Sequence, residues 1–335
     1  MINLRYHVVS LVAVFLALGM GIVMGSTVID RVTVDALNNN LNSVRNDINR
    51  TREENSRLAE QVREGQEFAD QSLTHVLRDQ LSGVPVLVVA VTGVDRRPVE
   101  SLRQSLLASG ASLQGTIWVN SKMRLDNEGE TRALAAALAS ATPGATTTTP
   151  ADAPASTSTT VFGAAAAEVR RQALARLVAE PGPLAAMVSA GFLGYEPPPE
   201  AASPSATDAA GAAPAPAPGM GVIPVAGTRF VVVSGAGAEV GDDLLAIPLA
   251  QVLATGGGPA VAAEAGQDTD GGRGVFVGLL RSDATANGKV STVDNLESPM
   301  GQAAVILALA ELGESRVGHF GVGPGAQRLL PALPA

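Results

Sequence analysis

The sequence predicts an α/β protein in which a single N-terminal transmembrane helix and a coiled-coil stalk precede a doubly wound, mostly parallel α/β domain with disordered Pro/Thr/Ala-rich inserts. Three observations predict this fold class. Residues 8–29 contain no ionisable side chain, the next apolar positions recur at alternating steps of three and four, and short β-branched runs then alternate with helical patterns. Alternating β and α segments are typical of parallel sheets covered by helices.

Composition excludes several kinds of protein. Of the 335 residues, 46% are hydrophobic but only 3% are aromatic, so Ala, Val and Leu must build the core. The net charge of −9 and the absence of a basic patch in the folded region argue against a nucleic-acid partner. Because there is no cysteine, disulfides, thiolate metal sites and Cys nucleophiles are excluded.

The apolar stretch at residues 8–29 is long enough to cross a membrane. Its 22 residues make a helix of about 33 Å, against a hydrocarbon core of about 30 Å. Arg5 before it favours a cytoplasmic tail at residues 1–7 and a main domain outside the cytoplasm. The alternative is a cleaved signal peptide with residues 8–18 as its apolar core. We favour the anchor because the apolar run continues past a normal cleavage point and no A-x-A pattern follows.

Gly21 and Gly25 form a G-x-x-x-G pattern within this stretch. On a membrane helix, such a pair opens a groove for the close approach of a second helix. Chance in a Gly-rich helix explains the pattern equally well, and both interpretations stay open.

Residues 32–80 are predicted to form a coiled coil. The heptad places Leu41, Ile48, Asn55 and Val62 at a positions and Leu37, Val44 and Leu58 at d positions. A buried Asn at an a position favours a parallel homodimer in one register, and Asp47 and Arg52 have the spacing of an interchain ion pair. The alternative is a helix packed on its own domain, which would need a wider apolar stripe.

The first part of the α/β domain is predicted at residues 83–141. Its continuous apolar runs indicate buried parallel strands. The predicted elements are strand 83–91, helix 99–109, strand 112–119 and helix 128–139. A disordered loop at 142–160, a helical segment at 161–195 with helices 162–179 and 184–193, and a Pro/Ala linker at 196–227 follow.

The second part of the domain is predicted at residues 228–335. It contains strand 228–234, helix 242–254, strand 259–263, a further candidate strand at 274–280 and helix 300–312. We expect one interrupted doubly wound sheet, with two small domains as the alternative.

A ligand pocket is a candidate at the carboxyl edge of this sheet, formed by Gly235, Gly237, Asp294, Asn295 and His319. Glycines between a strand and a helix can approach a phosphate, but Gly241 lies one place too late for the dinucleotide pattern. Asp242 and Asp243 would repel phosphate and cap the helix themselves. The alternatives are a Gly-rich turn at residues 235–241 and, at residues 294–298, a loop in which Ser298 caps a helix beginning at Pro299.

No motif in the sequence supports an enzyme. There is no G-x-S-x-G, H-E-x-x-H or Walker sequence, so we predict no catalytic residue and no bound cofactor. Metal ligands stay unknown. Met thioethers suit Cu(I), but Met20 and Met24 are the only pair on one helical face, and apolar packing explains them better.

Three segments resemble the MctB family, the mycobacterial copper transport protein B group. They are the opening MINLRYHVVSLVAVFLALGMGIVMGS, the segment VDNLESPMGQ at 293–302 and the segment GHFGVGPGA at 318–326. The resemblance spans nearly the whole chain except the two inserts. It implies a cell-envelope protein of copper efflux and copper homeostasis, with copper as the transported ion, and a pore-forming component of the outer membrane. No copper ligand is carried over, and the residues alone fit an inner-membrane anchor equally well.

Three functions therefore compete at this point. The first is copper export from the envelope, the second is a structural coiled-coil scaffold without transport activity, and the third is a small-molecule-binding α/β module. The Gly235, Asp294 and His319 positions must lie together for the third to hold.

Overall fold

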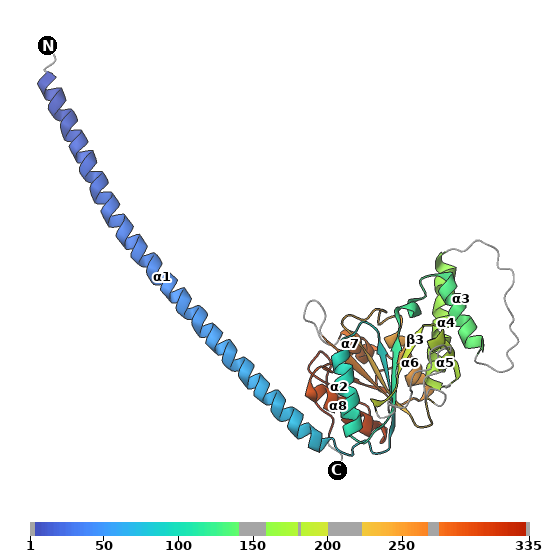
Figure 1. The fold of residues 1–335 in the computed structure, drawn as a ribbon. Helices are drawn as coiled ribbons and strands as arrows, with labels where there is room; N and C mark the ends of the chain where they lie inside the picture. The colour runs from blue at the N-terminus through green and yellow to red at the C-terminus, as the bar shows by residue number, and fades with distance from the viewer. Residues whose placement is uncertain (1–3, 141–158, 180–181, 200–222, 267–274, 333–335) are drawn as a thin grey trace, which may run out of the picture. The chain divides into compact units, whose positions relative to one another are not determined.

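The computed structural model describes residues 4–140, 159–179, 182–199, 223–266 and 275–332 (Figure 1). It divides into two compact units, Met1–Gly65 and Gln66–Ala335. Most of the predicted loop at 142–160 and of the predicted linker at 196–227 lies outside the described residues.

The first unit is a continuous helix. It is the main part of α1, Leu4–Val76, the last residues of which belong to the second unit. The stretch Arg5–Gly25 has 21 residues and a mean hydropathy of 2.5, so it is long and apolar enough to cross a membrane. The heptad positions Leu37, Leu41, Val44 and Ile48 lie on this helix with exposed side chains.

The second unit is built around one seven-stranded sheet in the order β3-β2-β1-β4-β5-β6-β7. All neighbours are parallel except β3, which runs antiparallel to β2. The strands are β1 Pro85–Val91, β2 Ser112–Val119, β3 Leu193–Glu196, β4 Arg229–Gly235, β5 Ala260–Ala265, β6 Val290–Val293 and β7 His319–Phe320.

The two sequence halves share this sheet because β1 and β4 pair directly, from Val86 opposite Arg229 to Ala90 opposite Val233. The expected single interrupted sheet is therefore confirmed. The central strands are buried on both faces, which explains their nearly continuous apolar sequence.

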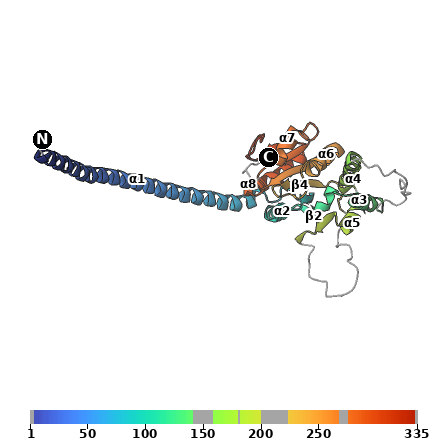
Figure 2. The ribbon, with the colours of Figure 1, turned by 90° about the horizontal axis from the view of Figure 1, so that it is seen from above.

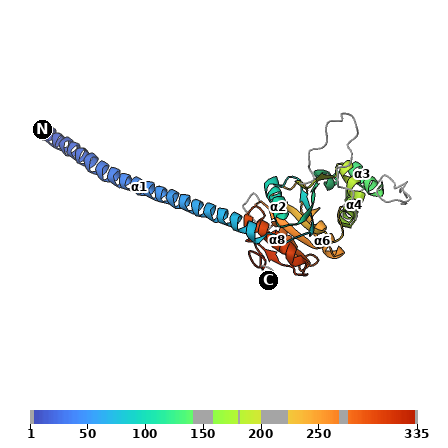
Figure 3. The same cartoon turned by 60° about the horizontal axis from the view of Figure 1, so that its bottom comes forward.

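Helices cover both faces of the sheet (Figures 2 and 3). Helices α2, Arg96–Ala108, and α8, Pro299–Leu312, pack against each other on one face, and α6, Ala246–Gly256, and α7, Val275–Ser282, pack together on the other. Three further helices form a cluster: α3, Glu128–Ser140, α4, Thr159–Ala179, and α5, Gly182–Ser189. This cluster contacts the rest of the domain through α4, which packs on α6, and through α5, which packs on β3. The turn η1, Ser121–Arg124, follows β2.

The predicted strand at 274–280 is wrong, because residues 275–280 lie in helix α7 and residue 274 lies outside the described residues. The Glu264 carboxylate accepts the backbone N–H groups of Val275 and Val277, which otherwise have no partner at a helix start. The buried residues Phe276, Val277 and Leu280 then follow a helical spacing. Because the capping residue Glu264 lies on strand β5, the sequence of the helix itself contains no signal of its start. A short apolar run is by itself compatible with either a strand or a helix.

The predicted helix at 184–193 is also too long. Helix α5 ends at Ser189, and Gly191 with φ +77° turns the chain into β3. The strands β6 and β7 were not predicted because four and two residues are too few to show a pattern.

Candidate functional site

Doubly wound sheets bind ligands where neighbouring strands continue in opposite directions. Here that position lies at the carboxyl ends of β1 and β4, because β1 is followed by β2 on one side and β4 by β5 on the other. The predicted pocket residues Gly235 and Gly237 lie at this position.

The loops after β1 and β4 are in direct contact there. The Glu239 N–H donates to the Thr92 carbonyl at 2.7 Å, and the Thr92 hydroxyl donates to the Glu239 carboxylate at 2.9 Å. Gly93 has φ +94°, and a Cβ on it would lie 2.1 Å from the Gly237 carbonyl oxygen. The glycines thus allow two loops of this chain to approach, which favours the Gly-rich turn over a phosphate site.

Asp242 does not cap helix α6 as predicted. The helix begins four residues later at Ala246, and no side chain caps it. The Asp242 carboxylate instead accepts a hydrogen bond from the Ser234 hydroxyl at the end of β4. Burial raises the pKa of Asp242, and the nearby Asp243 adds to this rise.

Asp294 lies at the end of β6 and is completely buried. Its Oδ1 accepts the Val322 N–H at 2.7 Å, its Oδ2 accepts the Gly323 N–H at 3.0 Å, and Arg281 forms an ion pair with it at 2.9 Å. Each carboxylate oxygen therefore has a partner inside the protein.

His319 is held on both ring nitrogens. Its Nδ1 lies 3.0 Å from the Thr292 hydroxyl and its Nε2 lies 2.9 Å from Asn287 Oδ1. Burial lowers the pKa of His319, and the charge of Arg281 lowers it further. Burial and the Arg281 charge therefore both favour the neutral imidazole within this polar network.

Asn295 takes part in the start of helix α8. Its amide donates to the Ser298 hydroxyl at 3.0 Å, and this hydroxyl accepts the Gly301 N–H at 3.0 Å. Pro299 is the first helical residue. The capped-loop interpretation of residues 294–298 is thus confirmed.

The five predicted pocket residues fall into two groups. Asp294 and Asn295 lie in the loop after β6 and His319 lies on the neighbouring strand β7, whereas Gly235 ends β4 and Gly237 lies in the loop after it. Two strands separate β4 from β7, which places the ends roughly 14 Å apart at about 4.8 Å per strand.

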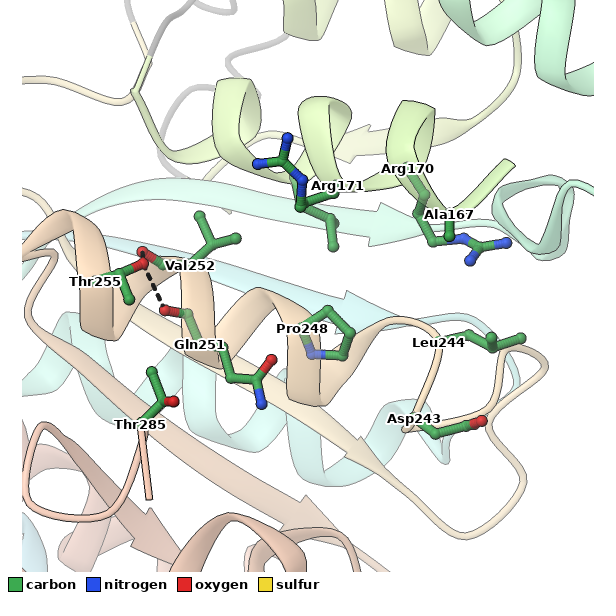
Figure 4. A pocket seen from close by; sticks show the side chains of 11 residues that line it. Ala167, Arg170, Arg171, Asp243, Leu244, Pro248, Gln251, Val252, Thr255 and Thr285 are labelled. Carbon is green, nitrogen blue, oxygen red and sulfur yellow. Dashed lines mark hydrogen bonds between the residues drawn. The ribbon is translucent and has the colours of Figure 1, made fainter. Parts of the chain in front are cut away.

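A cavity lies elsewhere, between α4 and α6 (Figure 4). It has a volume of about 510 Å³ and an apolar wall that includes Leu174, Pro248 and Val252. Arg170 and Arg171 of α4 contribute to one side of its lining, and Gln251 and Thr255 of α6 to the other.

Both arginines of this cavity have partners within the chain. Arg170 Nε donates to the Met123 carbonyl at 2.8 Å and its Nη2 donates to the Arg124 carbonyl. Arg171 pairs with Glu168 at 2.6 Å. Arg170 therefore joins α4 to the turn η1, and burial lowers its pKa.

A second polar cluster lies at the β2–β3 edge. The Glu196 carboxylate accepts from the Trp118 indole and pairs with Arg96 at 2.9 Å and with the buried Arg103. Burial by itself would raise the pKa of Glu196, but the Trp118 hydrogen bond and the two arginine charges lower it below its ordinary value. Arg96 also lies over the Trp118 ring, 4.4 Å from its centroid.

Potential metal ligands are dispersed. Within the described ranges, no three His, Cys, Asp or Glu side chains are grouped so that they could hold a metal ion. Met123 and Met187 are completely buried in the core.

A comparison with family models identifies the chain. A model described as "Copper transport outer membrane protein, MctB" matches residues 1–331. The chain belongs to the MctB family.

Curated MctB proteins are similar over their whole length. Proteins named "Copper transporter MctB" from Mycobacterium bovis (strain ATCC BAA-935 / AF2122/97) and from two strains of Mycobacterium tuberculosis are 26% identical over 334 residues. The match covers 97% of this chain and 98% of each relative. The resemblance read from the three sequence segments is therefore confirmed.

Two of the MctB-like segments hold each other in place. Asp294 of VDNLESPMGQ binds the backbone of GHFGVGPGA at Val322 and Gly323. Gly321 has φ +122°, and a Cβ on it would lie 2.1 Å from Asp294 Oδ1. These segments therefore lock the C-terminal part of the MctB body onto β6.

The sequence did not predict the role of Arg281, whose side chain binds both of these segments. Its guanidinium donates to the Thr292 hydroxyl and to the carbonyls of Phe320 and Pro324. The available signal is a single Arg that follows the apolar residues of 275–280, but nothing local indicates its partners.

The predicted oligomerisation residues all lie on α1 in the first unit. They are Gly21, Gly25, Leu41, Ile48, Asn55 and Leu58. Among the described residues, nothing beyond the helix's own backbone lies within 4 Å of a Cβ built on Gly21 or Gly25, and the side chains of Leu41, Ile48, Asn55 and Leu58 are exposed.

Proposed function

We propose that this protein supports copper efflux and copper homeostasis at a cell-envelope membrane. The observation that carries the proposal is the match of residues 1–331 to the MctB copper transport family. The relatives named copper transporters align over 98% of their own length, so no separate transport domain of theirs lacks a counterpart here. Copper is the transported ion in this proposal, not a resident cofactor.

The membrane attachment is proposed to be the uncleaved N-terminal helix. The stretch Arg5–Gly25 supports this by its length and hydropathy, and helix α1 continues beyond it to Val76. If this helix crosses the inner membrane, residues 1–7 are the cytoplasmic tail and the α/β body lies outside the cytoplasm. The family description supports the outer membrane, and a single apolar helix is equally suited to the inner membrane.

Deletion of the gene tests the copper proposal. Under copper stress, the deletion strain should hold more cell-associated copper than the parent and grow less well, and the full chain should restore both. Cell-associated zinc, measured in the same samples, should not change. Unchanged copper content together with unchanged copper tolerance would refute the proposal.

Fractionation combined with N-terminal sequencing tests the anchor. An attached helix predicts a membrane-bound protein whose sequence starts at its first residues. A mature chain that begins downstream of Ser26 and stays in the soluble fraction would show a signal peptide instead.

A pore-forming role extends the proposal and rests on the family resemblance. Purified full-length protein in a planar bilayer should then give stepwise conductance, and the lack of any conductance at high protein load would oppose it.

The second candidate function is a structural scaffold without transport activity. It is favoured by the direct contact between the loops after β1 and β4, which occupies the position where such sheets bind ligands. Calorimetric copper titration of the purified protein separates the two, since tight binding would count against a purely structural role.

A further inference from the structure

Helix α1 presents a narrow apolar stripe between residues 37 and 62. Leu37, Val44 and Leu58 stand at d positions and Leu41, Ile48 and Val62 at a positions, and each of these residues is 45–58% exposed. Thr51 occupies the remaining d position, and its hydroxyl donates to the Asp47 carbonyl of its own helix at 2.8 Å. The stripe therefore spans about four heptads and is interrupted by two polar residues, Thr51, whose hydroxyl is already satisfied, and Asn55.

The residues that flank this stripe carry opposite charges on its two sides. In this heptad the e positions include Arg45 and Arg52, and the g positions include Asp47 and Glu54. All four side chains are exposed on the helix surface. The segregation of charge distinguishes the two possible orientations of a second helix.

A parallel pair in register brings each g position beside the e position five residues further along the other chain. Asp47 then lies beside Arg52 of the second copy, and the symmetric pair forms on the other side. The e and g residues of a parallel pair therefore attract each other.

An antiparallel pair brings like charges together. When Leu41 lies opposite Leu58 and Ile48 opposite Thr51, Asp47 of one chain faces Glu54 of the other and Arg45 faces Arg52. Like charges at these positions are unfavourable. The charge pattern thus selects the parallel orientation.

The core positions also select the number of helices. β-branched Ile48 and Val62 at a with Leu37 and Leu58 at d favour two strands. Asn55 at an a position can pair with Asn55 of a second copy only in the parallel, in-register arrangement. The seam ends at Gly65, which has no side chain to pack at the next d position.

We propose that residues 37–65 pair with the same segment of a second copy of this chain as a parallel, in-register, two-stranded coiled coil. The occupant of the apolar stripe is thus another copy, and not the α/β body of the same chain. This proposal is independent of copper transport.

Cysteine crosslinking tests the pairing because the chain has no native cysteine. In the full-length protein in detergent, Leu41→Cys should form a disulfide-linked dimer of twice the monomer mass under mild oxidation, because facing a positions lie within disulfide range. The matched control is Asn46→Cys, which lies at an outward f position and should stay monomeric on the same gel. Equal crosslinking of both variants, or none at Leu41→Cys, would overturn the proposal.

A mixture of two variants tests orientation. Leu41→Cys chains that crosslink to Leu58→Cys chains but not to each other would show the antiparallel pairing and overturn the proposal.

A charge exchange gives an independent measurement. Arg52→Asp should raise the dimer dissociation constant several-fold in analytical ultracentrifugation, since it places two acids side by side. Adding Asp47→Arg should restore it. If the double variant dimerises as weakly as the single variant, Asp47 does not pair with Arg52 of the second copy.

Discussion

Asp294 and Arg281 form an ion pair of 2.9 Å. The Asp294 side chain is fully buried and the Arg281 side chain is 5% exposed. They come from the end of β6 and from α7, and between them they bind the backbone of residues 320–324. The conformation of the C-terminal segment thus depends on a charge pair that water does not reach.

Asp294→Asn should therefore be strongly destabilising. The substitution leaves the Arg281 charge buried without its acid, which costs about 3–5 kcal/mol. Urea unfolding followed by fluorescence of the single tryptophan, Trp118, measures the change. The control is Glu314→Gln, which removes an exposed pair with Arg316 and should cost less than about 1 kcal/mol. Similar losses in the free energy of unfolding for both variants would show that the buried ion pair contributes no more than an exposed one.

Two helical glycines should respond in opposite directions to alanine. In α8, a Cβ on Gly301 would lie 1.9 Å from the Asn295 carbonyl oxygen, so Gly301→Ala must displace backbone and destabilise the body. In α7, no described residue places an atom within 4 Å of a Cβ on Gly278 apart from the helix's own backbone, so Gly278→Ala should stabilise by about 0.5–1 kcal/mol. Thermal unfolding of both variants checks the prediction, and a stabilising Gly301→Ala would contradict it.

His319 should make stability depend on pH. Because burial and Arg281 lower its folded pKa, the unfolded chain binds a proton first as the pH falls. The contribution of the neutral His319 is complete above the ordinary value of about 6.5, and it is lost as the pH falls from there toward the folded pKa.

The measurement for His319 is the free energy of unfolding between pH 8 and pH 5. His319→Gln should flatten the decline below about pH 6.5. The same substitution at the exposed His75 should leave the slope in place. An unchanged slope in His319→Gln would assign the dependence to other groups.

Ser298 should contribute as the cap of α8. Its hydroxyl accepts the Gly301 N–H, so Ser298→Ala should cost about 1 kcal/mol in urea unfolding. Ser282, at the exposed end of α7, donates only to carbonyls of its own helix, and Ser282→Ala should have almost no effect. A cost at Ser298 no larger than at Ser282 would argue against the cap.

The candidate ligand site was only partly accessible from the sequence. The sequence predicts Asp294 and Asn295 at the carboxyl edge of the parallel sheet, but it gives no spacing that relates them to His319, because the strand β7 that carries His319 is too short to show a pattern. It could not show that Gly237 contacts Gly93, a residue 144 positions earlier. Nor could it show that the Asp294 carboxylate binds the backbone of residues 322 and 323, because both contacts depend on the packing of distant segments.

By itself, the sequence determined the features that are written in local periodicity. These are the apolar N-terminal helix, the heptad stripe, the buried strands β1, β2, β4 and β5, and helix α8 with its Ser298 cap. Only the tertiary structure decided that residues 275–282 are a helix, that β3, β6 and β7 extend the sheet and that Arg281 reaches Asp294. The physical reason is that a helix cap, a short edge strand and a buried ion pair draw their stability from partners far away in the chain, so no local pattern records them.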